Sequence, residues 1–244
     1  MNYYAKTDIG QVRSKNQDQA FVGANLKNQV LAVVCDGMGG HKAGEIASRL
    51  VMDHITGCFK SNPAFLNEEE VKAWIMETIL QSNTIVQKMA KGNKDHEGMG
   101  TTVVLAILME DILYVSHVGD SRAYTCDNEQ IVQVTKDHTL VNALIDQGAI
   151  NQEEAKHHSQ KNVLLQAIGA SEDVTPSFYS MDFKDKTLLL CSDGLYNAVD
   201  EDTILGILKE EMRVDEKVRT LIDCANKQGG HDNIAVSIIE SGGM

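Results

Sequence analysis

The stretch VLAVVCDGMGGHKAGE, residues 30–45, runs six apolar residues directly into an aspartate and then into glycines. The apolar run has the length and the β-branched content of a buried strand. A carboxylate at the end of such a strand is costly to bury, and the glycines that follow it give the backbone unusual freedom. The stretch therefore predicts a strand that carries Asp36 to the rim of a rigid scaffold, followed by a helix.

The composition limits the class of protein. Of the 244 residues, 43% are hydrophobic, and no repeat or linker interrupts the chain, so we expect a single domain over residues 1–244. Asp and Glu number 35 against 22 Lys and Arg, and this acidic balance argues against nucleic acid as a partner. The first residues lack the pattern of a signal peptide, and the longest apolar run, residues 103–109, is too short to span a bilayer. We therefore expect a soluble, cytoplasmic protein with no membrane partner.

The five cysteines lie far apart and form no C-x-x-C pair, which disfavours a disulfide framework or a zinc knuckle. Cys35 and Cys191 each end an apolar run, as small buried hydrophobic residues do. None of the five has an arginine six positions later, so the spacing that a cysteine phosphatase needs is absent.

Strands outnumber helices in the pattern of the sequence. Helical periodicity gives apolar faces over residues 46–55 and 71–86, and a third helical segment covers residues 214–227. Meanders of strands with helices early and late suit antiparallel sheets that carry helices on their outer faces. Apolar runs rich in β-branched residues predict strands over residues 3–7, 20–23, 30–35, 101–109, 112–118, 122–126, 131–134, 187–191 and 233–239.

Residues 139–170 break this pattern. The pieces LVNALIDQGAI and NQEEAKHH have short helical patterns, and the strand signal is weak. We expect a short helical flap inserted into the domain over these residues, and we expect it to be mobile.

Several aspartates stand next to apolar runs: Asp36, Asp120, Asp193 and Asp232. Each taken alone fits a turn, because Asp-Gly and Gly-Asp commonly end strands. Strands lying side by side would gather the carboxylates at one rim, where mutual repulsion would raise their pKa values unless a cation lay among them. Carboxylates and backbone carbonyls are ligands that Mg²⁺ and Mn²⁺ prefer, and Gly37 can turn its own carbonyl toward an ion. The pattern therefore predicts Mg²⁺ or Mn²⁺, and two such ions can hold a hydroxide and neutralise a phosphoryl group.

A phosphate site is predicted beside these carboxylates. The stretch DIGQVRSKNQD contains Arg13, with Asp18 close behind it at the start of a strand. Arginine donates two parallel hydrogen bonds to phosphate oxygens, although a lone arginine in a loop is usually a solvated charge. His41 follows the glycines and could protonate the leaving alkoxide, although alone it would fit a surface histidine.

Taken in order, these motifs resemble the PPM or PP2C family of metal-dependent serine/threonine protein phosphatases, in its small stand-alone bacterial form. The resemblance covers essentially the whole chain, and seven blocks in the same order are more specific than any one of them. The blocks are TDIGQVRSKNQD, VVCDGMGGHKAGEIAS, GMGTTVVLAIL, VSHVGDSRAY, TKDHTLVNALIDQGAI, LLLCSDGLYN and GGHDNIAVSII.

The resemblance implies an α+β fold with four layers, in which two antiparallel sheets form a central sandwich and helices cover both outer faces. It also implies a dinuclear Mg²⁺ or Mn²⁺ centre at one edge of the sandwich. Asp36 resembles the carboxylate that bridges both core metals, and the Gly37 carbonyl resembles a ligand of the second. Asp193 and Asp232 resemble ligands of the first.

The remaining positions resemble supporting roles in the family. Asp18 matches the acidic residue that meets the metal shell through water, and Asp120 matches the residue that joins Asp193 around a possible third metal. Arg13 matches the phosphate-binding arginine, and Asn233 is expected to steady the site by hydrogen bonding.

The chain departs from the family pattern in two places. Animal enzymes carry their general-acid histidine directly after Asp-Gly, whereas this chain has Met38 there and His41 as the nearest histidine. In the predicted flap, Lys161 and Gln166 stand where relatives often have arginines. The departures bear on the general acid and on flap contacts to substrate, not on the metal set.

The leading hypothesis is hydrolysis of phosphoserine and phosphothreonine on proteins by a metal-activated water. By analogy with the family, we expect a partner serine/threonine kinase whose phosphorylation is reversed, and we expect a monomer. One alternative is a catalytically silent regulatory domain on the same scaffold, which the complete ligand set disfavours. A phosphoesterase acting on small molecules stays open, because specificity resides in loops and flap.

Overall fold

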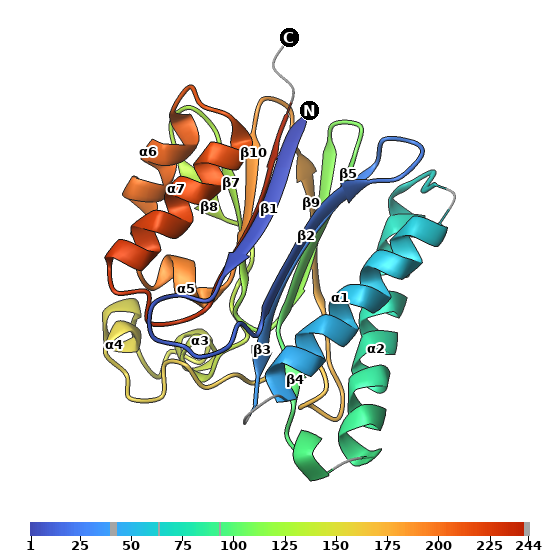
Figure 1. Ribbon diagram of the computed structural model, residues 1–244, viewed down its shortest axis with the longest axis vertical. Coiled ribbons are helices and arrows are strands. Elements are labelled where there is room, and N and C mark those ends of the chain that lie inside the picture. Colours follow the sequence, from blue (N-terminus) through green and yellow to red (C-terminus); the bar gives the residue numbers. More distant parts are fainter. Residues whose placement is uncertain (40–42, 63, 93, 242–244) are drawn as a thin grey trace.

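The computed structural model describes residues 1–39, 43–62, 64–92 and 94–241. Two antiparallel sheets pack against each other, and helices cover both outer faces (Figure 1). The first sheet has the strand order β1 (Asn2–Asp8), β11 (Ile234–Glu240), β10 (Thr187–Cys191), β7 (Arg122–Cys126) and β8 (Ile131–Gln133). The second has the order β2 (Asp18–Ala24), β3 (Val30–Met38), β5 (Val103–Met109), β6 (Ile112–Val118) and β9 (Ser177–Asp182), and β4 (Gly100–Thr101) pairs with β3.

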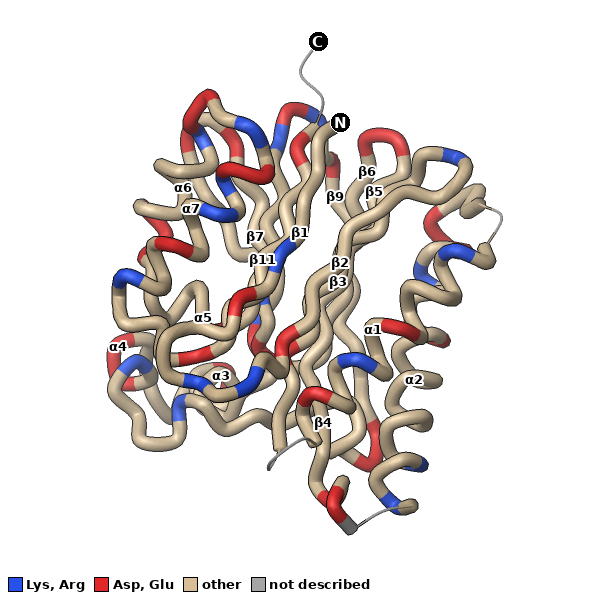
Figure 2. The backbone as a smooth tube through the Cα atoms, viewed as in Figure 1, with Lys and Arg blue, Asp and Glu red and all other residues tan. Residues whose placement is uncertain are grey.

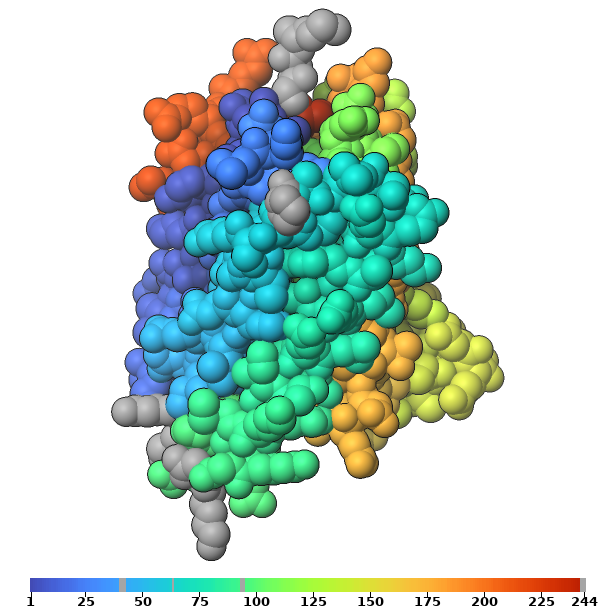
Figure 3. All heavy atoms as spheres, turned by 90° about the vertical axis from the view of Figure 1, so that its right-hand side faces the viewer, coloured from blue at the N-terminus to red at the C-terminus, as the bar shows by residue number. Residues whose placement is uncertain are grey.

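The helices divide between the two outer faces. Helices α1 (Ala43–Ser61) and α2 (Glu68–Gly92) pack on the second sheet, and Figure 3 shows that they cover that side of the molecule. Helices α6 (Glu201–Lys209) and α7 (Val214–Lys227) pack on the first sheet. The shorter helices are η1 (Lys94–His96), α3 (Leu140–Asp146), α4 (Gln152–Lys156) and α5 (Asp193–Tyr196). The predicted four-layer α+β fold is confirmed.

Strand β3 shows why its sequence is apolar without interruption. Alternate side chains of a strand point to opposite faces of the sheet. One set, Val30, Ala32 and Val34, packs in the layer between the sheets. The other set, Leu31, Val33 and Cys35, packs against α1 and α2. Both faces of the strand are buried, which fixes its register and holds Asp36 at a defined place.

The elements differ from the sequence predictions in a few places. Strand β9 was not predicted, because SFYSMD mixes polar and aromatic residues and lies at a partly exposed sheet edge. The strand predicted over residues 101–109 is interrupted at Thr102, whose N–H donates to the Asp36 carbonyl (2.9 Å). Helices α5 and α6 were also missed, since both are short.

Residues 139–170 contain α3 and α4, as the helical pattern predicted. Backbone hydrogen bonds join the two ends of this segment, from Leu140 N to the Val163 carbonyl (2.9 Å) and from Leu165 N to the His138 carbonyl (2.8 Å). The segment lies beside α5 in Figure 1 and projects from the body of the molecule in Figure 3. That it is a mobile flap stays a prediction.

Within the part of the chain that the structure describes, none of the helices combines the length and the apolar character that crossing a membrane requires.

Candidate metal centre

Strand register brings the predicted carboxylates to one end of the sandwich. Asp18, at the start of β2, lies directly opposite Asp36 in β3. In the first sheet, Cys191 at the end of β10 pairs with Arg122 at the start of β7, so the residues around Asp193 and Asp120 lie at this same end. Figure 2 shows acidic segments from several strands meeting there, with basic segments of the loop after β1 running past them.

Asp36 lies at the centre of this group. It retains some solvent-exposed surface, but it lies deep in the molecule, and burial raises the pKa of its carboxyl well above the usual range. Repulsion from the other carboxylates raises this pKa further, in the order Asp18, Asp193, Asp120 and Asp232. All the predicted acidic ligands are therefore within electrostatic reach of one residue.

Asp18 is held by a hydroxyl group from the opposite sheet. Its side chain is 2% exposed, and Ser192 Oγ donates to Asp18 Oδ2 (2.6 Å). Burial, followed by repulsion from Asp193 and Asp232, raises the pKa of Asp18 to about 7, although the Ser192 hydrogen bond counteracts part of the rise. The hydroxyl of Ser192 also accepts a hydrogen bond from Ala235 N (2.8 Å). Sequence analysis missed Ser192, although a hydroxyl residue directly before Asp193 was the available signal.

The pKa values of Asp193 and Asp120 are raised in the same way. Burial and repulsion from Asp232 raise the pKa of Asp193 to about 6, while the Arg13 guanidinium counteracts this. Burial and repulsion from Asp193 and Asp137 raise the pKa of Asp120 to about 7. Carboxyl groups with pKa values near neutrality are strongly perturbed, and such groups gather at functional sites.

Arg13 and Asp232 form an ion pair across the mouth of the site. Arg13 Nη2 donates to Asp232 Oδ2 at 2.6 Å, and the two side chains are 52% and 37% exposed. The guanidinium predicted to bind phosphate therefore lies directly beside a predicted metal ligand. An exposed pair of this kind contributes little to stability and leaves the arginine free to exchange partners.

Asn233 fastens the loop that carries Arg13. Its Oδ1 accepts a hydrogen bond from Gln17 N (2.9 Å), and its Nδ2 donates to the carbonyls of Ile9 (2.9 Å) and Lys15 (2.8 Å). The residue is 6% exposed, so these bonds satisfy a buried amide. They hold residues 9–17 against the start of β11.

Gly37 is required by close backbone contacts. A Cβ atom at this position would overlap the carbonyl oxygen of Gly44 and would lie 2.7 Å from that of Gln17. Only glycine allows β3, α1 and the loop before β2 to approach this closely. These contacts fix the backbone at Gly37, whose carbonyl was predicted to be a metal ligand.

A second feature that the sequence did not reveal is a network on the Asp120 side. The Arg122 guanidinium donates through Nε and Nη2 to the Asp137 carboxylate, with the shortest bond 2.7 Å, and lies 3.6 Å above the Tyr196 ring. Tyr196 Oη donates to the Asp120 carbonyl (3.1 Å). The network gives the backbone at Asp120 a rigid support.

The chemistry of these donors fits Mg²⁺ or Mn²⁺. Clustered carboxylates whose charge is disfavoured by burial and mutual repulsion are a site that a hard cation would stabilise. Among the described residues, however, no three His, Cys, Asp or Glu side chains converge as the ligands of one ion would. The assignment of individual ligands therefore stays a prediction. His41, predicted as the general acid, lies outside the described residues.

Comparison with known proteins identifies the family. The pattern of the family described as Protein phosphatase 2C matches residues 10–235. The chain is 40% identical over 236 residues to the serine/threonine phosphatase stp of Listeria monocytogenes, covering 96% of this chain and 94% of that protein.

Two solved structures extend this likeness. Serine/threonine phosphatase Stp1 from Staphylococcus aureus has a TM-score of 0.92 and 35% identity, covering 99% of this chain and 95% of that one. The catalytic domain of the serine/threonine protein phosphatase PstP, in complex with two manganese ions, has a TM-score of 0.84 and 33% identity, covering 98% and 97%. The chain described here belongs to the Protein phosphatase 2C family.

Proposed function

We infer that this chain is a PP2C-type protein phosphatase that hydrolyses phosphoserine and phosphothreonine on proteins, with Mn²⁺ or Mg²⁺ as its cofactor. The observation that carries this conclusion is the group of carboxylates around Asp36, buried at one end of the sandwich in a chain of this family. A relative that binds two manganese ions supports a dinuclear centre. A catalytically silent binding domain is not favoured, since every predicted acidic ligand is present.

We propose that Asp36, the Gly37 carbonyl, Asp193 and Asp232 hold two core ions, with Asp18 acting through water. Asp120 and Asp193 would hold a third. Bound there, divalent ions supply a water nucleophile of lowered pKa and neutralise charge on the phosphoryl group.

The protein's own part in the reaction is orientation. Arg13 Nη2 lies 2.6 Å from Asp232 Oδ2, so its guanidinium is next to a proposed metal ligand and could donate hydrogen bonds to the oxygens of a bound phosphoryl group. Asn233 keeps the Arg13 loop in place through its three hydrogen bonds. Ser192 keeps Asp18 oriented from the opposite sheet. We also propose His41 as the residue that protonates the leaving oxygen.

We further propose a cytoplasmic monomer that reverses the work of a partner serine/threonine kinase. Relatives named as serine/threonine phosphatases support phosphoproteins as the substrates.

The test is hydrolysis of p-nitrophenyl phosphate and of a phosphothreonine peptide, each with Mn²⁺, with Mg²⁺ and with EDTA. We expect both substrates to be hydrolysed with metal and neither with EDTA. A folded protein that is inactive with both metals would overturn the proposed function. Hydrolysis of the small ester alone would point instead to a small-molecule phosphoesterase.

A further inference from the structure

Thr102 lies between the strand that carries Asp36 and the turn that carries Asp120. In the second sheet, β5 pairs with β3 on one side and with β6 on the other. Continued beyond the end of β5, the register of these pairings puts Thr102 beside Asp36 on one side and beside Gly119 on the other. One residue thus lies next to two predicted metal ligands from different parts of the chain.

The hydroxyl of Thr102 takes the place of a main-chain group in this pairing. In an antiparallel sheet, a hydrogen-bonded pair of facing residues exchanges two N–H···O=C bonds. Thr102 N donates to the Asp36 carbonyl (2.9 Å), but Asp36 N donates to Thr102 Oγ1 (3.0 Å) and not to the Thr102 carbonyl. That carbonyl accepts a hydrogen bond from Thr101 Oγ1 (2.9 Å). The position of the Asp36 main chain therefore depends on a side chain.

The same hydroxyl reaches Ser121, the residue after Asp120. Thr102 Oγ1 and Ser121 Oγ lie 2.6 Å apart and share a hydrogen bond. Thr102 is 2% exposed and Ser121 is 1% exposed, so bulk water does not replace a partner that is removed. A buried hydroxyl thus joins the main chain at Asp36 to the turn at Asp120.

Gly119 lets this turn come close to Thr102. Its φ of +103° lies in the left-handed region, and a Cβ atom there would lie 2.7 Å from Thr102 Cγ2. The methyl group of Thr102 therefore packs against the turn, while the hydroxyl forms hydrogen bonds on both sides. Because both branches of the side chain have contacts, its rotamer is fixed.

We propose that Thr102, together with Ser121, is a positioning residue of the metal centre, and that its hydroxyl sets the place of Asp36 relative to Asp120. The inference rests on the proposed function, because it requires that these two carboxylates bind metal. Asp36 and Asp120 repel each other, so no attraction between them fixes their spacing. Removing a residue that orients a metal ligand commonly lowers metal affinity by about 10- to 100-fold.

The test is calorimetric titration of the metal-free, folded protein with Mn²⁺. Thr102→Val keeps the shape of the side chain without its hydroxyl, and should weaken Mn²⁺ binding by about tenfold. Thr102→Ser keeps the hydroxyl and should bind Mn²⁺ much more tightly than Thr102→Val. An equal loss of affinity in the two variants would assign the effect to packing and overturn the role given to the hydroxyl.

Ser121→Ala tests the other end of the connection. It leaves the bond from Asp36 N to Thr102 in place, so it should weaken Mn²⁺ binding by less than Thr102→Val. Because the two hydroxyls act as one unit, the double variant should bind Mn²⁺ about as Thr102→Val alone does. Fully additive losses would contradict a shared role.

A second readout separates positioning from support of the fold. In Thr102→Val, the Mn²⁺ concentration that gives half-maximal hydrolysis of p-nitrophenyl phosphate should rise about tenfold, with a smaller change in kcat at saturating Mn²⁺. A residue that only stabilises the fold would lower Tm and leave this concentration unchanged.

Thr56→Val and Ser82→Ala are the matched controls. Both hydroxyls are buried and donate within helices, from Thr56 to the Met52 carbonyl (2.8 Å) and from Ser82 to the Thr78 carbonyl (2.8 Å). Both variants should bind Mn²⁺ as the wild type does.

The outcomes separate the two claims. Wild-type protein that binds no Mn²⁺ and hydrolyses no phosphate ester overturns the proposed function, and this inference with it. Wild-type protein that binds Mn²⁺, with the same affinity in folded Thr102→Val, overturns only the inference. If Thr102→Val does not fold, Mn²⁺ affinity and half-maximal concentration that are both unchanged in Ser121→Ala overturn it.

Discussion

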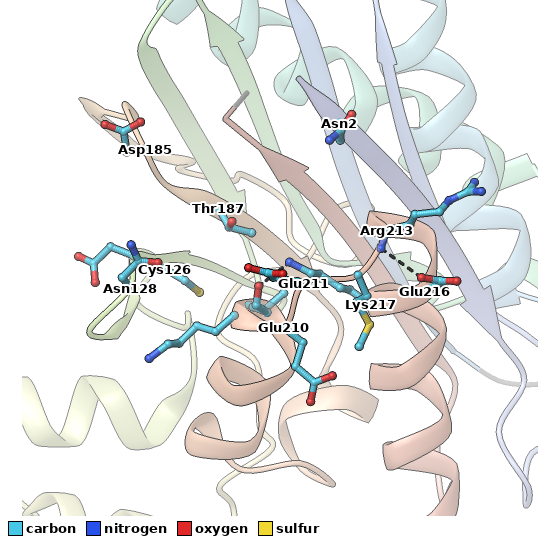
Figure 4. Close-up of a pocket in the computed structure, with 14 residues that line it drawn as sticks. Asn2, Cys126, Asn128, Asp185, Thr187, Glu210, Glu211, Arg213, Glu216 and Lys217 are labelled. Carbon is cyan, nitrogen blue, oxygen red and sulfur yellow. Dashed lines mark hydrogen bonds between the residues drawn. The ribbon is translucent and has the colours of Figure 1, made fainter. Parts of the chain in front are cut away.

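The two ends of the sandwich handle buried charge in opposite ways. At one end, Asp18, Asp120 and Asp193 lie around Asp36, and burial and repulsion raise the pKa values of these four carboxyl groups. At the other end, a pocket of about 690 Å³ is lined by interleaved acidic and basic side chains (Figure 4). There, buried Lys217 donates from Nζ to Glu240 Oε1 (2.7 Å) and to the Leu208 carbonyl (2.6 Å).

The difference supports the proposal that the carboxylate end holds the functional site and that the opposite end contributes to stability. Strands β10 and β11 run through both ends, so the same scaffold supports each arrangement. A buried charge that is paired and hydrogen-bonded is tolerated in a folded protein. A buried group of like charges destabilises the folded state, so stability does not explain its presence. The like charges at the carboxylate end therefore support the proposal that this end binds a cation.

The largest expected effect is on activity at the carboxylate end. Asp36→Asn keeps the shape of the side chain but removes a charge, and should lower kcat/KM by at least about 100-fold. Asp185→Asn, an exposed position at the pocket of Figure 4, is the matched control and should leave kcat/KM unchanged. Near-normal turnover by folded Asp36→Asn enzyme would contradict the proposal that the carboxylate end is the functional end.

The next effect is on stability at the opposite end. Lys217→Met would leave Glu240 and the Leu208 carbonyl without their partner and should lower the free energy of unfolding by about 3 kcal/mol. Denaturant unfolding measures this, with exposed Lys209→Met as the control. The folded fraction should keep its specific activity. A loss of activity that exceeds the loss of folded protein would show that the two ends are coupled.

Ser192 links the sheets at the carboxylate end. Ser192→Ala would remove the donor to Asp18 and the acceptor of Ala235 N, and should cost about 2 kcal/mol of stability. Buried Ser237 makes one longer bond, to the Phe21 carbonyl at 3.4 Å, so Ser237→Ala should cost less. Equal losses of unfolding free energy in the two variants would show that the hydrogen bonds of Ser192 contribute no more than that of Ser237.

The smallest effect is on the pH dependence of the metal-free protein. The pKa of Asp18 rises from 3.8 to about 7 on folding, so its contribution to stability is full below pH 3.8 and is lost as pH rises through about 7. Asp120 and Asp193 have the same sign, with pKa values of about 7 and about 6. In EDTA, Tm should therefore be lower at pH 8 than at pH 6. This difference in Tm should be smaller in Asp18→Asn.

His117 has the opposite sign, and its effect extends mainly to lower pH. Burial, followed by the neighbouring His138, lowers the pKa of His117 from 6.5 to about 4, so stability from this residue is lost as pH falls from 6.5. Because this loss already begins at the lower end of the range from pH 6 to 8, a Tm that is nevertheless lower at pH 8 than at pH 6 reports on the carboxylates. A Tm that rises over this range in EDTA would contradict the account of the carboxylate end.

Much of the architecture was predictable from local pattern. The uninterrupted run before Asp36 predicted a buried strand, and the periodicity of α1, α2 and α7 predicted helices, because burial on one or both faces leaves a regular signal. Edge strand β9 lacked that signal, since its side chains are only partly buried. Short helices such as α5 offer too few residues for periodicity to show.

For the site, sequence predicted the acidic residues but not what holds them. Aspartates at strand ends are visible as motifs, whereas the bond from Ser192 to Asp18 joins residues far apart in the chain. The stacking of Arg122 on Tyr196 likewise depends on how β7 and α5 meet. Such contacts follow from tertiary packing, so only the folded chain reveals them.

The most direct test of the central claim is calorimetric titration of metal-free protein with Mn²⁺, for the wild type, Asp36→Asn and Asp185→Asn. We predict that wild type and Asp185→Asn bind at least two ions with similar affinity, and that Asp36→Asn loses the tight binding. Equal binding by all three folded proteins would contradict a metal centre built around Asp36.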